Sequence, residues 1–382
     1  MGAANGNTNA TNGPRSRIWL RKICWQPLIK SVILMSRPRG KNLTVDRTLL
    51  QERLLSIIRR FGDRRILVIG DLIADQFVYG AIDRVSREAP VFILRHEHTE
   101  TLPGGAANCA MNLASLGAAV SLIGIRGDDE PGNAVNDKLN SAGVDTTGLL
   151  VSSAVRTTTK VRILAGQLHS TRQQVIRIDY VGDPLTDTAV REKLRESVLE
   201  QAHTVDAVIV SDYNYGVADG EMAAFTRDLA AARKIPLLAD SRFRLASFAG
   251  FTSATPNEDE VEQLLRKQIA SVAELESAAE ELREQLGYRA LLVTRGGHGM
   301  MLLEDGIPAI HIDAVGSHEP VDVTGAGDTV IAAYALALAS DSSFPDAARI
   351  ANYAGGLVIM KRGTASVTRE ELESSVLHSE IS

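Results

Sequence analysis

Short apolar runs alternate with amphipathic segments along most of this chain. Residues 66–69 (Ile-Leu-Val-Ile) form one such run, which is typical of a strand buried on both faces of a parallel sheet. Further strands are expected at residues 120–125, 207–211, 237–240 and 290–294, and helices at residues 45–60, 106–116, 221–233, 258–265, 272–286 and 329–339. This alternation predicts a parallel sheet with helices on both of its faces.

Residues 77–101 and 156–178 instead alternate apolar and polar side chains. Because this period of two is typical of antiparallel strands, we expect a small β-sheet lid, at about residues 72–103 and 155–180, over the carboxyl ends of the main strands. The predicted fold class is α/β, a Rossmann-like parallel sheet with a β lid, in one domain at residues 45–382. Exposed lid edges can pair between subunits, so a homodimer through the lid is expected.

Residues 1–44 differ in composition from the rest of the chain. Residues 1–47 carry nine Lys/Arg and one acidic residue, whereas the remainder has a net charge of −14. Residues 2–13 are predicted to be disordered, and residues 19–34 mix apolar and basic side chains, as in a membrane-surface helix or a targeting segment. A start codon placed too early, with Met35 as the true start, is the other interpretation. We favour that or plain disorder over targeting.

Composition excludes several classes of function. The chain has 382 residues, of which 45% are apolar, enough to bury a substantial core. No apolar run is long enough to insert stably across a bilayer, and the acidic body argues against nucleic-acid binding. The two cysteines, Cys24 and Cys109, imply no disulfide framework, which fits a reducing cytoplasm.

The stretch Asp322-Val323-Thr324-Gly325-Ala326-Gly327-Asp328 leads into a long apolar segment that is predicted to be a buried helix. The loop would present the N–H groups of Gly325, Ala326 and Gly327 at a helix N-terminus, where unpaired donors and the helix dipole favour an anion. Asp328, at the mouth of this site, can take a proton from a hydroxyl while the amides hold a transferring phosphoryl group. An ordinary glycine turn before a helix carboxylate is the simpler alternative.

A second motif, Pro103-Gly104-Gly105-Ala106-Ala107-Asn108, opens another apolar segment. Two glycines followed by small residues let the backbone pass close to a bound molecule, and Asn108 can both donate to and accept from a polyol hydroxyl. Together, and in this order, the two motifs resemble the signatures of the ribokinase-like PfkB family of sugar kinases. The resemblance covers about residues 66–367.

This resemblance implies ATP-dependent phosphoryl transfer to a sugar hydroxyl, with Mg²⁺ as cofactor. It makes Asp328 the catalytic base and the loop Gly325, Ala326 and Gly327 the anion hole. Asn257 and Glu260 would lie beside the phosphates and Mg²⁺, which Glu260 would hold directly or through water. A helix cap with its capping-box partner is a compatible interpretation of the same pair.

The rest of the nucleotide site is expected at a glycine loop that ends a strand and at a helix near the end of the chain. The other residues expected to contact the nucleotide are Thr294, Gly296, Gly297 and Asn352. Asp322 and the loop at residues 363–366 match places where relatives hold a monovalent cation, so a K⁺ site at Asp322 is a further hypothesis.

The sugar site is expected to draw on Asp71, Asp75, Gly104, Gly105 and Asn108, since carboxylates and amides suit polyol hydroxyls. Further segments, among them residues 85–91, 158–162 and 173–179, resemble the kinase half of the heptose kinase/adenylyltransferase enzymes of lipopolysaccharide-precursor synthesis. Those enzymes use ATP to phosphorylate O1 of D-glycero-D-manno-heptose 7-phosphate. A sugar phosphate needs cations, for which Lys160, Arg162, Arg172 and Arg177 are the candidates, although basic residues also occupy exposed lid edges.

Two departures from that subfamily leave the acceptor open. Residues 240–243 are Asp-Ser-Arg-Phe where relatives have Asp-Pro-Lys-Gly, and residues 212–216 are Asp-Tyr-Asn-Tyr-Gly where relatives have Asp-Tyr-Ala-Lys-Gly. Another sugar (fructose, ribose or a nucleoside), a binding module that has lost catalysis, and a basic-tailed membrane-associated protein are the alternatives. No His-x-Gly-His motif is present, so the kinase reaction alone is expected.

Overall fold

The computed structural model describes residues 41–166, 172–316 and 319–378. The chain divides into two units after Thr44, and the unit Val45–Ser382 is described by itself. The expectations for residues 1–40 lie outside the described part of the chain. Among the helices that are described, none has both the length and the apolar character needed to span a bilayer.

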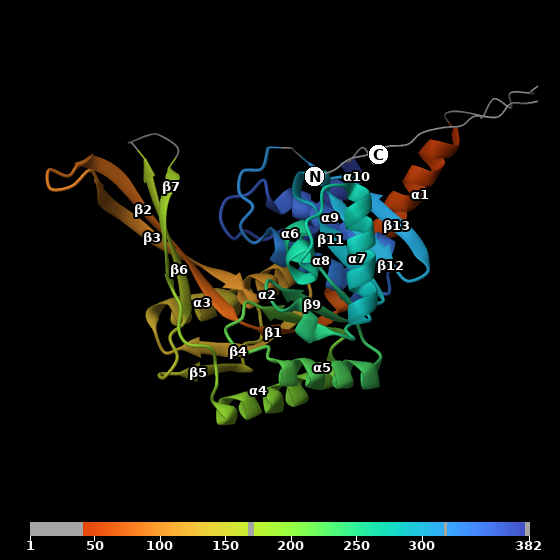
Figure 1. Cartoon of the computed structure of the whole chain (residues 1–382), viewed down its shortest axis with the longest axis horizontal. Coiled ribbons are helices and arrows are strands. Elements are labelled where there is room, and N and C mark those ends of the chain that lie inside the picture. The colour runs from red at the N-terminus through yellow and green to blue at the C-terminus, as the bar shows by residue number, and fades with distance from the viewer. Residues whose placement is uncertain (1–40, 167–171, 317–318, 379–382) are drawn as a thin grey trace, which may run out of the picture. The chain divides into compact units, whose positions relative to one another are not determined.

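Within the described residues, six parallel strands form the main sheet (Figure 1). In spatial order they are β10 (Ser253–Ala254), β9 (Leu237–Ser241), β8 (Ala207–Asp212), β1 (Arg65–Gly70), β4 (Ala119–Gly127) and β5 (Leu149–Ser152). Side chains of the central strand β1 alternate between two cores, with Ile66 and Val68 in one and Leu67 and Ile69 in the other. Strand β1 is therefore buried on both faces, as its apolar run predicted.

Helices cover both faces of this sheet. One core is closed by α1 (Lys41–Ile58), α2 (Ala106–Ser115), α3 (Glu130–Ser141), α8 (Ala326–Ala339), α9 (Phe344–Val358) and α10 (Arg369–His378). The other is closed by α4 (Thr188–Gln201), α5 (Gly220–Arg233), α6 (Glu258–Leu265) and α7 (Val272–Leu286). The predicted fold class, a parallel sheet between two helical layers, is confirmed.

One strand pairs differently from the expectation. The strand β11 (Ala290–Thr294) was expected in the parallel sheet, but it pairs antiparallel with β12 (Met300–Glu304), which pairs in turn with β13 (Ile307–Ile312). A single parallel bridge, Asn257 to Thr294, joins it to the segment after β10. Because β10 has only two residues, it can form few backbone hydrogen bonds with β11. The short turn between β11 and β12 allows the longer, antiparallel pairing.

The lid is a four-stranded sheet in the order β3 (Phe92–Gly105), β2 (Leu72–Val85), β6 (Thr158–Gly166) and β7 (Gln173–Tyr180), and it extends away from the main sheet (Figure 1). The outer pairs are antiparallel, as predicted, but the central pair of β2 and β6 is parallel. Strand β2 continues from β1, and β6 follows β5. Both leave the same edge of a parallel sheet, so they run in the same direction.

Candidate active site

Asp328 lies in the first turn of α8, where the chain passes from the motif loop into the buried helix. It is 3% exposed, while the preceding residue, Gly327, is exposed to solvent. Its carboxylate accepts a hydrogen bond from Asn108 Nδ2 at Oδ2 (2.8 Å) and another from the Tyr213 hydroxyl at Oδ1 (2.9 Å). The two sequence motifs therefore meet at this carboxylate, which each of two side chains orients through one oxygen.

Gly325 is the residue that makes this approach sterically feasible. It caps α8 with φ +76°, a left-handed conformation that side chains with a Cβ rarely adopt. A Cβ built there would lie 2.5 Å from Asn108 Nδ2, inside the van der Waals distance. A Cβ at Gly327, in contrast, would meet no atom within 4 Å. The two glycines thus have different roles, one in packing and one in leaving open space at the helix N-terminus.

A chain of hydrogen bonds continues from Asp328 into the core between α2 and α8. Asn112 Nδ2 donates to Asn108 Oδ1 (3.2 Å), and Thr329 Oγ1 donates to Asn112 Oδ1 (3.0 Å). These buried amides fix which end of the Asn108 side chain faces Asp328, because the oxygen of Asn108 is occupied by Asn112. Asn108, expected to contact a sugar hydroxyl, is 1% exposed and its amide is committed to the carboxylate.

Burial raises the pKa of Asp328 to about 6. The hydrogen bonds from Asn108 and Tyr213 act in the opposite direction, because they stabilise the ionised form. Of the nearby charges, Asp75 raises the pKa of Asp328 and Lys160 lowers it. A carboxylate with a pKa close to neutral can accept a proton and release it again near physiological pH, as a general base must.

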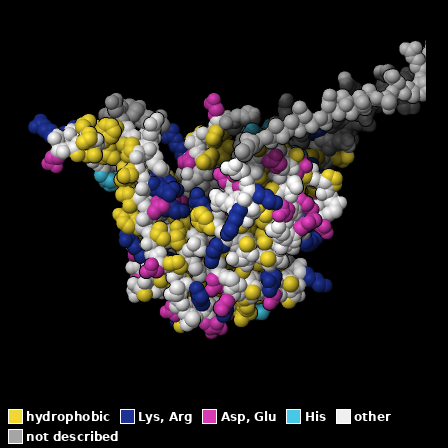
Figure 2. Space-filling view, viewed as in Figure 1, with side chains coloured by type: hydrophobic (Ala, Val, Ile, Leu, Met, Phe, Trp, Pro, Cys, Tyr) yellow, Lys and Arg dark blue, Asp and Glu magenta, His cyan; other side chains and the backbone are white. Residues whose placement is uncertain are grey.

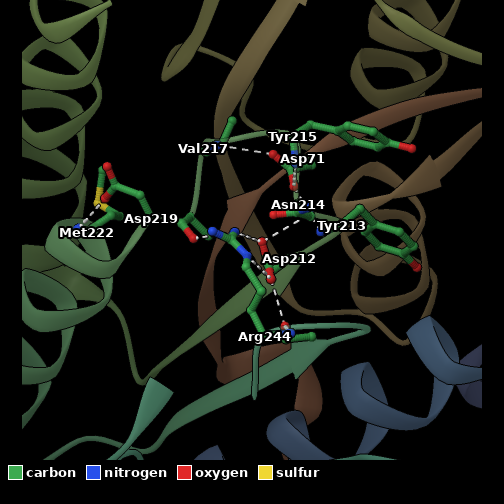
Figure 3. Close-up of polar contacts among 11 residues, drawn as sticks. Asp71, Asp212, Tyr213, Asn214, Tyr215, Val217, Asp219, Met222 and Arg244 are labelled. Atoms are coloured by element: carbon green, nitrogen blue, oxygen red, sulfur yellow. Dashed lines mark hydrogen bonds and ion pairs between the residues drawn. The ribbon is translucent and has the colours of Figure 1, made fainter. Parts of the chain in front are cut away.

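Asp71, predicted to contact the sugar, instead holds a loop. Its Oδ2 accepts hydrogen bonds from the backbone N–H groups of Tyr213 (2.8 Å) and Tyr215 (3.0 Å), and its Oδ1 accepts one from Val217 (3.1 Å), as Figure 3 shows. The side chain is buried, which raises its pKa although the three amides lower it. The observed contacts of Asp71 are structural, and its direct contact with a sugar stays a prediction.

Asp75 is buried in an ion pair with Arg162, which also lies over the Phe77 ring at 5.3 Å. A Cβ on Gly104 would lie 2.4 Å from Asp75 Oδ2, so the glycine leaves room for this carboxylate. Gly105, with φ +58°, passes equally close to the Asp71 backbone oxygen, 2.7 Å from a built Cβ. The first glycine of the motif therefore leaves room for the Asp75 carboxylate, and the second for the backbone oxygen of Asp71.

The four candidate cations of the lid differ in what they contact. Arg162 is paired with Asp75, Arg172 with Glu97, and Arg177 with Asp179 through two bonds of 2.9 and 3.0 Å on the exposed strand β7. Lys160 Nζ lies over the Tyr213 ring at 5.3 Å, and burial lowers its pKa. Within the described residues Lys160 has no carboxylate partner within 4 Å, which leaves its charge available beside Asp328.

A cavity of about 430 Å³ is lined in part by the first turns of α8. It gathers four residues predicted for the nucleotide, Thr294, Gly296, Gly297 and Asn352, together with Ala326 and Gly327 of the anion-hole motif. Its remaining walls are largely apolar, with Met300, Val315, Val323, Val330 and Ile359 among them. Asn352 does not point freely into this space, because its Nδ2 donates to the Asp313 carbonyl (2.7 Å) and so fixes one wall.

Asn257 and Glu260 form the capping box of α6, with reciprocal bonds of 2.9 Å. The cap accounts for Glu260 Oε2, and burial raises the pKa of this carboxyl. In the part of the chain that the structure describes, no group of three or more His, Cys, Asp or Glu side chains is placed to hold a metal ion.

Asp322 joins the second motif to the loop at residues 363–366. Its Oδ1 accepts from the Thr324 N–H (2.9 Å) and its Oδ2 from the Gly363 N–H (2.9 Å). The Thr364 hydroxyl oxygen is buried and has no hydrogen-bond partner among the described residues. A buried oxygen without a donor, next to a carboxylate that anchors the loop, is a suitable ligand for a hard cation.

Sequence reasoning did not identify Tyr213 or the Gly355-Gly356 pair as site residues. Tyr213 follows β8 directly, at the strand edge where ligands bind in α/β sheets, and that position was the available signal. Gly355 and Gly356 both line the cavity from inside α9, and a Cβ on Gly356 would lie 2.1 Å from the Val315 carbonyl oxygen. Two adjacent glycines within a helix were the signal for this close approach.

Comparison with known proteins adds to this geometry. Residues 63–371 match the family described as "pfkB family carbohydrate kinase". The chain is 40% identical over 318 residues to the bifunctional protein HldE of Pseudomonas aeruginosa (strain LESB58), covering 83% of this chain and 64% of that protein. It is 38% identical over 322 residues to the protein of the same name from Pseudomonas entomophila (strain L48), covering 84% and 65%. The chain spans less than two thirds of these curated relatives.

Solved structures share the fold at lower identity. Arabidopsis thaliana ribokinase in complex with ribose and ATP superposes with a TM-score of 0.64 at 19% identity, covering 83% of this chain and 99% of that one. Escherichia coli phosphofructokinase-2 in complex with potassium gives a TM-score of 0.66 at 18% identity, covering 82% and 98%. At these identities the likeness concerns the fold alone.

Proposed function

This chain belongs to the pfkB family of carbohydrate kinases, and from that premise we propose that it transfers the γ-phosphoryl group of ATP to O1 of D-glycero-D-manno-heptose 7-phosphate. The observation that carries the proposal is the 2.8 Å hydrogen bond from Asn108 to Asp328. That bond joins the two motifs into one site, with a base of suitable pKa beside the N-terminus of a helix.

In the proposed reaction the O1 oxygen of the sugar attacks the γ-phosphorus of ATP. The bond between O1 and phosphorus forms while the bond from phosphorus to the β–γ bridging oxygen breaks, and ADP leaves. Asp328 accepts the hydroxyl proton, and the N–H groups of Gly325 and Gly327 hold the moving phosphoryl oxygens, joined by the Ala326 N–H when it leaves its 3.3 Å bond to the Val323 carbonyl. The products are ADP and heptose 1,7-bisphosphate, with the proton on the Asp328 carboxylate until solvent removes it.

The nucleotide is proposed to occupy the cavity that Thr294, Gly296, Gly297 and Asn352 line. Its mostly apolar walls suit a base, and its position against Ala326 and Gly327 leads the phosphates to the anion hole. Mg²⁺, held through water near Glu260 and Asn257, would neutralise charge on the β- and γ-phosphates. Ribokinase of the same fold is known in complex with ribose and ATP, which supports this arrangement.

We also infer a K⁺ site at Asp322 and the Thr364 hydroxyl. The support is the buried Thr364 oxygen without a donor, and the Asp322 carboxylate that ties this loop to the second motif. A protein with the same fold, phosphofructokinase-2, is known in complex with potassium. If this site is occupied, replacing K⁺ by tetramethylammonium at constant ionic strength lowers kcat, whereas equal rates in the two salts would contradict the site.

The choice of heptose 7-phosphate rests on the segments that resemble the heptose enzymes and on the relatives named bifunctional protein HldE. It is supported by the uncommitted charge of Lys160, which the lid holds close to the base. Arg242 stands where those enzymes have lysine, and its charge acts on both Lys160 and Glu260. Lys160 and Arg242 are therefore proposed as cations for a charged acceptor or for the phosphoryl group that it receives.

A panel of acceptors tests this proposal. Purified protein with ATP and Mg²⁺ is incubated with heptose 7-phosphate, fructose, ribose and adenosine, and ADP release is measured, with ³¹P NMR of the product. We expect turnover of heptose 7-phosphate, a second sugar phosphate resonance at C1, and no turnover by Asp328→Asn. Fast turnover of a free sugar beside none of heptose 7-phosphate would refute the choice of acceptor while leaving the kinase activity in place.

We propose that the protein acts in the cytoplasm, where ATP is supplied. We also propose that two copies associate through the lid. Hydrophobic side chains gather over the lid in Figure 2, where Val85, Val91 and Phe92, and Val175 and Ile176 on β7, are each at least half exposed. Such a surface is favourably covered by a second copy. Sedimentation should give a dimer for the wild type and for Val272→Asp on α7, and a monomer for Ile176→Asp. A monomeric wild type at micromolar concentration would dismiss the dimer.

A further inference from the structure

The hydroxyl of Tyr213 contacts the same carboxylate that the two motifs bring together. It donates to Asp328 Oδ1 at 2.9 Å, while Asn108 Nδ2 donates to Oδ2 at 2.8 Å. Each oxygen of the base thus has one directed donor, and rotation of the carboxylate would break both bonds. Tyr213 lies outside both sequence motifs, so nothing in those motifs assigns it a role.

The backbone of Tyr213 is held by hydrogen bonds to Asp71, the residue that follows β1. The N–H groups of three alternate residues, Tyr213, Tyr215 and Val217, donate to its buried carboxylate at 2.8, 3.0 and 3.1 Å (Figure 3). A carboxylate that accepts three backbone bonds holds a loop firmly, because loss of any one would leave a polar group unsatisfied. The position of the Tyr213 side chain is therefore set by the end of the neighbouring strand.

A second carboxylate fixes the same loop from the other side. Asp212 Oδ2 accepts from Ser241 Oγ (2.6 Å), and the Arg244 guanidinium pairs with the Asp212 carboxylate and donates to the Ala218 carbonyl (3.0 Å) (Figure 3). Asp212 Oδ1 also accepts from the N–H of Asn214, whose φ of +66° turns the chain sharply after Tyr213. The loop is held at both ends, which orders the tyrosine before any ligand binds.

We infer that Tyr213 is a positioning residue for the catalytic base: its hydroxyl orients the Asp328 carboxylate toward the acceptor hydroxyl and favours its ionised form. The inference rests on the proposed function, since it assigns a part in the same proton transfer. Tyr213 does not exchange the proton itself, because burial and the neighbouring carboxylates raise the pKa of its hydroxyl well above the ordinary value.

The charges around Asp328 set the direction of the expected change. Asp75 on β2 raises the pKa of Asp328, and Lys160 on β6 lowers it. Asp240 on β9 and the Cys109 thiol on α2 also face this carboxylate, and burial raises the pKa of each. Removal of the Tyr213 hydroxyl takes away one of the interactions that lower the pKa of Asp328, so that pKa should rise.

Tyr213→Phe isolates this hydroxyl. Phenylalanine keeps the ring over which Lys160 Nζ lies at 5.3 Å, and the backbone bonds to Asp71 do not involve the side chain. We expect the acid limb of kcat/KM against pH to move up by about half to one pH unit. On the alkaline plateau kcat should fall about tenfold, with an unchanged KM for ATP, because orientation of the base is impaired.

Tyr334→Phe is the matched control. Tyr334 lies on the same helix, α8, is fully buried, and its hydroxyl lies 3.3 Å from Ser253 Oγ. The control loses a buried tyrosine hydroxyl without touching Asp328, so it should lower stability and leave the acid limb where it was. Incorporation of 3-fluorotyrosine at position 213, a stronger donor of nearly the same size, should move the limb in the opposite direction, to lower pH.

An infrared titration separates this inference from the proposed function. The carbonyl band of the protonated Asp328 carboxyl, identified by its loss in Asp328→Asn, gives the pKa without any substrate. A higher midpoint in Tyr213→Phe than in the wild type supports the inference. An unchanged midpoint, or an unchanged acid limb with full kcat, overturns it. If no sugar is phosphorylated, the proposed function is refuted, and the infrared midpoint still decides the effect of Tyr213 on the carboxyl group.

Discussion

Asn108 Nδ2 donates a hydrogen bond of 2.8 Å to Asp328 Oδ2 across a sequence separation of 220 residues. The bond connects the start of α2 to the start of α8, two helices that pack side by side in one core. Both partners are nearly fully buried, so the bond is protected from competing water. A carboxylate held this way has one preferred orientation before a substrate arrives.

Asn108→Ala should therefore impair both catalysis and folding. The lost hydrogen bond to a charged group should cost about 1.5–3 kcal/mol of stability, and because the carboxylate is then less well oriented, kcat should fall by roughly 10- to 100-fold. The acid limb of the pH profile should also shift upward, because the bond lowers the pKa of Asp328. Asn133→Ala, on the surface of α3, removes an exposed bond to Arg126 and should leave kcat unchanged. Equal kcat for Asn108→Ala and the wild type would contradict this role.

Gly325→Ala should lower stability, because the left-handed φ of +76° is strained for alanine by about 1–2 kcal/mol. The added Cβ would also press on the Asn108 amide at 2.5 Å, so the total cost should reach about 3 kcal/mol. Urea unfolding measures this loss. Gly327→Ala provides the comparison, since its Cβ would enter open space, and it should unfold at nearly the wild-type midpoint. Equal midpoints for both variants would show that the loop relaxes around residue 325.

The sequence predicted the layers of the fold well because they follow from the burial of single elements. An apolar run such as residues 66–69 is buried on both faces wherever it lies in a parallel sheet. The direction of pairing does not follow in the same way. Both β2 and β6 show a period of two, yet their parallel pairing depends on which edge of the main sheet each one leaves.

The same distinction between local patterns and long-range contacts applies to the candidate site. The turn at Gly325, the helix start at Ala326 and the residues that line the cavity follow local motifs, because each motif contains its own turn and helix start; the catalytic role of Asp328 stays a prediction. Asp71 is predicted to contact the sugar because it follows a strand, and its hydrogen bonds to backbone amides more than 140 residues away could not be read from any local motif. The contact of Tyr213 with Asp328 could not be predicted from the sequence either, because it forms only once β8 and α8 are packed.

Asp328→Asn should stabilise the protein at alkaline pH while abolishing turnover. The folded-state pKa of about 6 lies above the 3.8 of an unfolded chain, so the stability from this group is fully present below about pH 3.8 and is lost as pH rises through 6. At pH 8 a neutral side chain avoids a cost of up to about 3 kcal/mol. Asparagine can still accept from Asn108 and donate to the Tyr213 oxygen.

Urea unfolding at pH 8 and at pH 5 measures this effect. The advantage of Asp328→Asn over the wild type should be largest at pH 8 and should shrink toward pH 5, where the wild-type carboxyl is mostly protonated. Asp341→Asn, at an exposed aspartate that pairs with Arg60 and Arg64, is the control for the loss of a surface carboxylate. A variant that is less stable than the wild type at pH 8 would mean that the carboxylate is better solvated than its burial indicates.

Gly356→Ala should weaken nucleotide binding without touching the base. Its Cβ would lie 2.1 Å from the Val315 carbonyl oxygen, so either α9 or the segment around Val315 must move. That segment forms a wall of the cavity and is tied to α9 through the bond from Asn352 to the Asp313 carbonyl. Displacement of the wall should raise KM for ATP about tenfold, with a change in kcat of less than about twofold, because the loss concerns ground-state and transition-state binding alike.

Overpacking by Gly356→Ala should also cost about 1–3 kcal/mol of stability. Gly220→Ala, at the exposed start of α5 where a Cβ meets no atom within 4 Å, is the control and should change neither quantity. An unchanged KM for ATP in a folded Gly356→Ala would place the nucleotide outside this cavity.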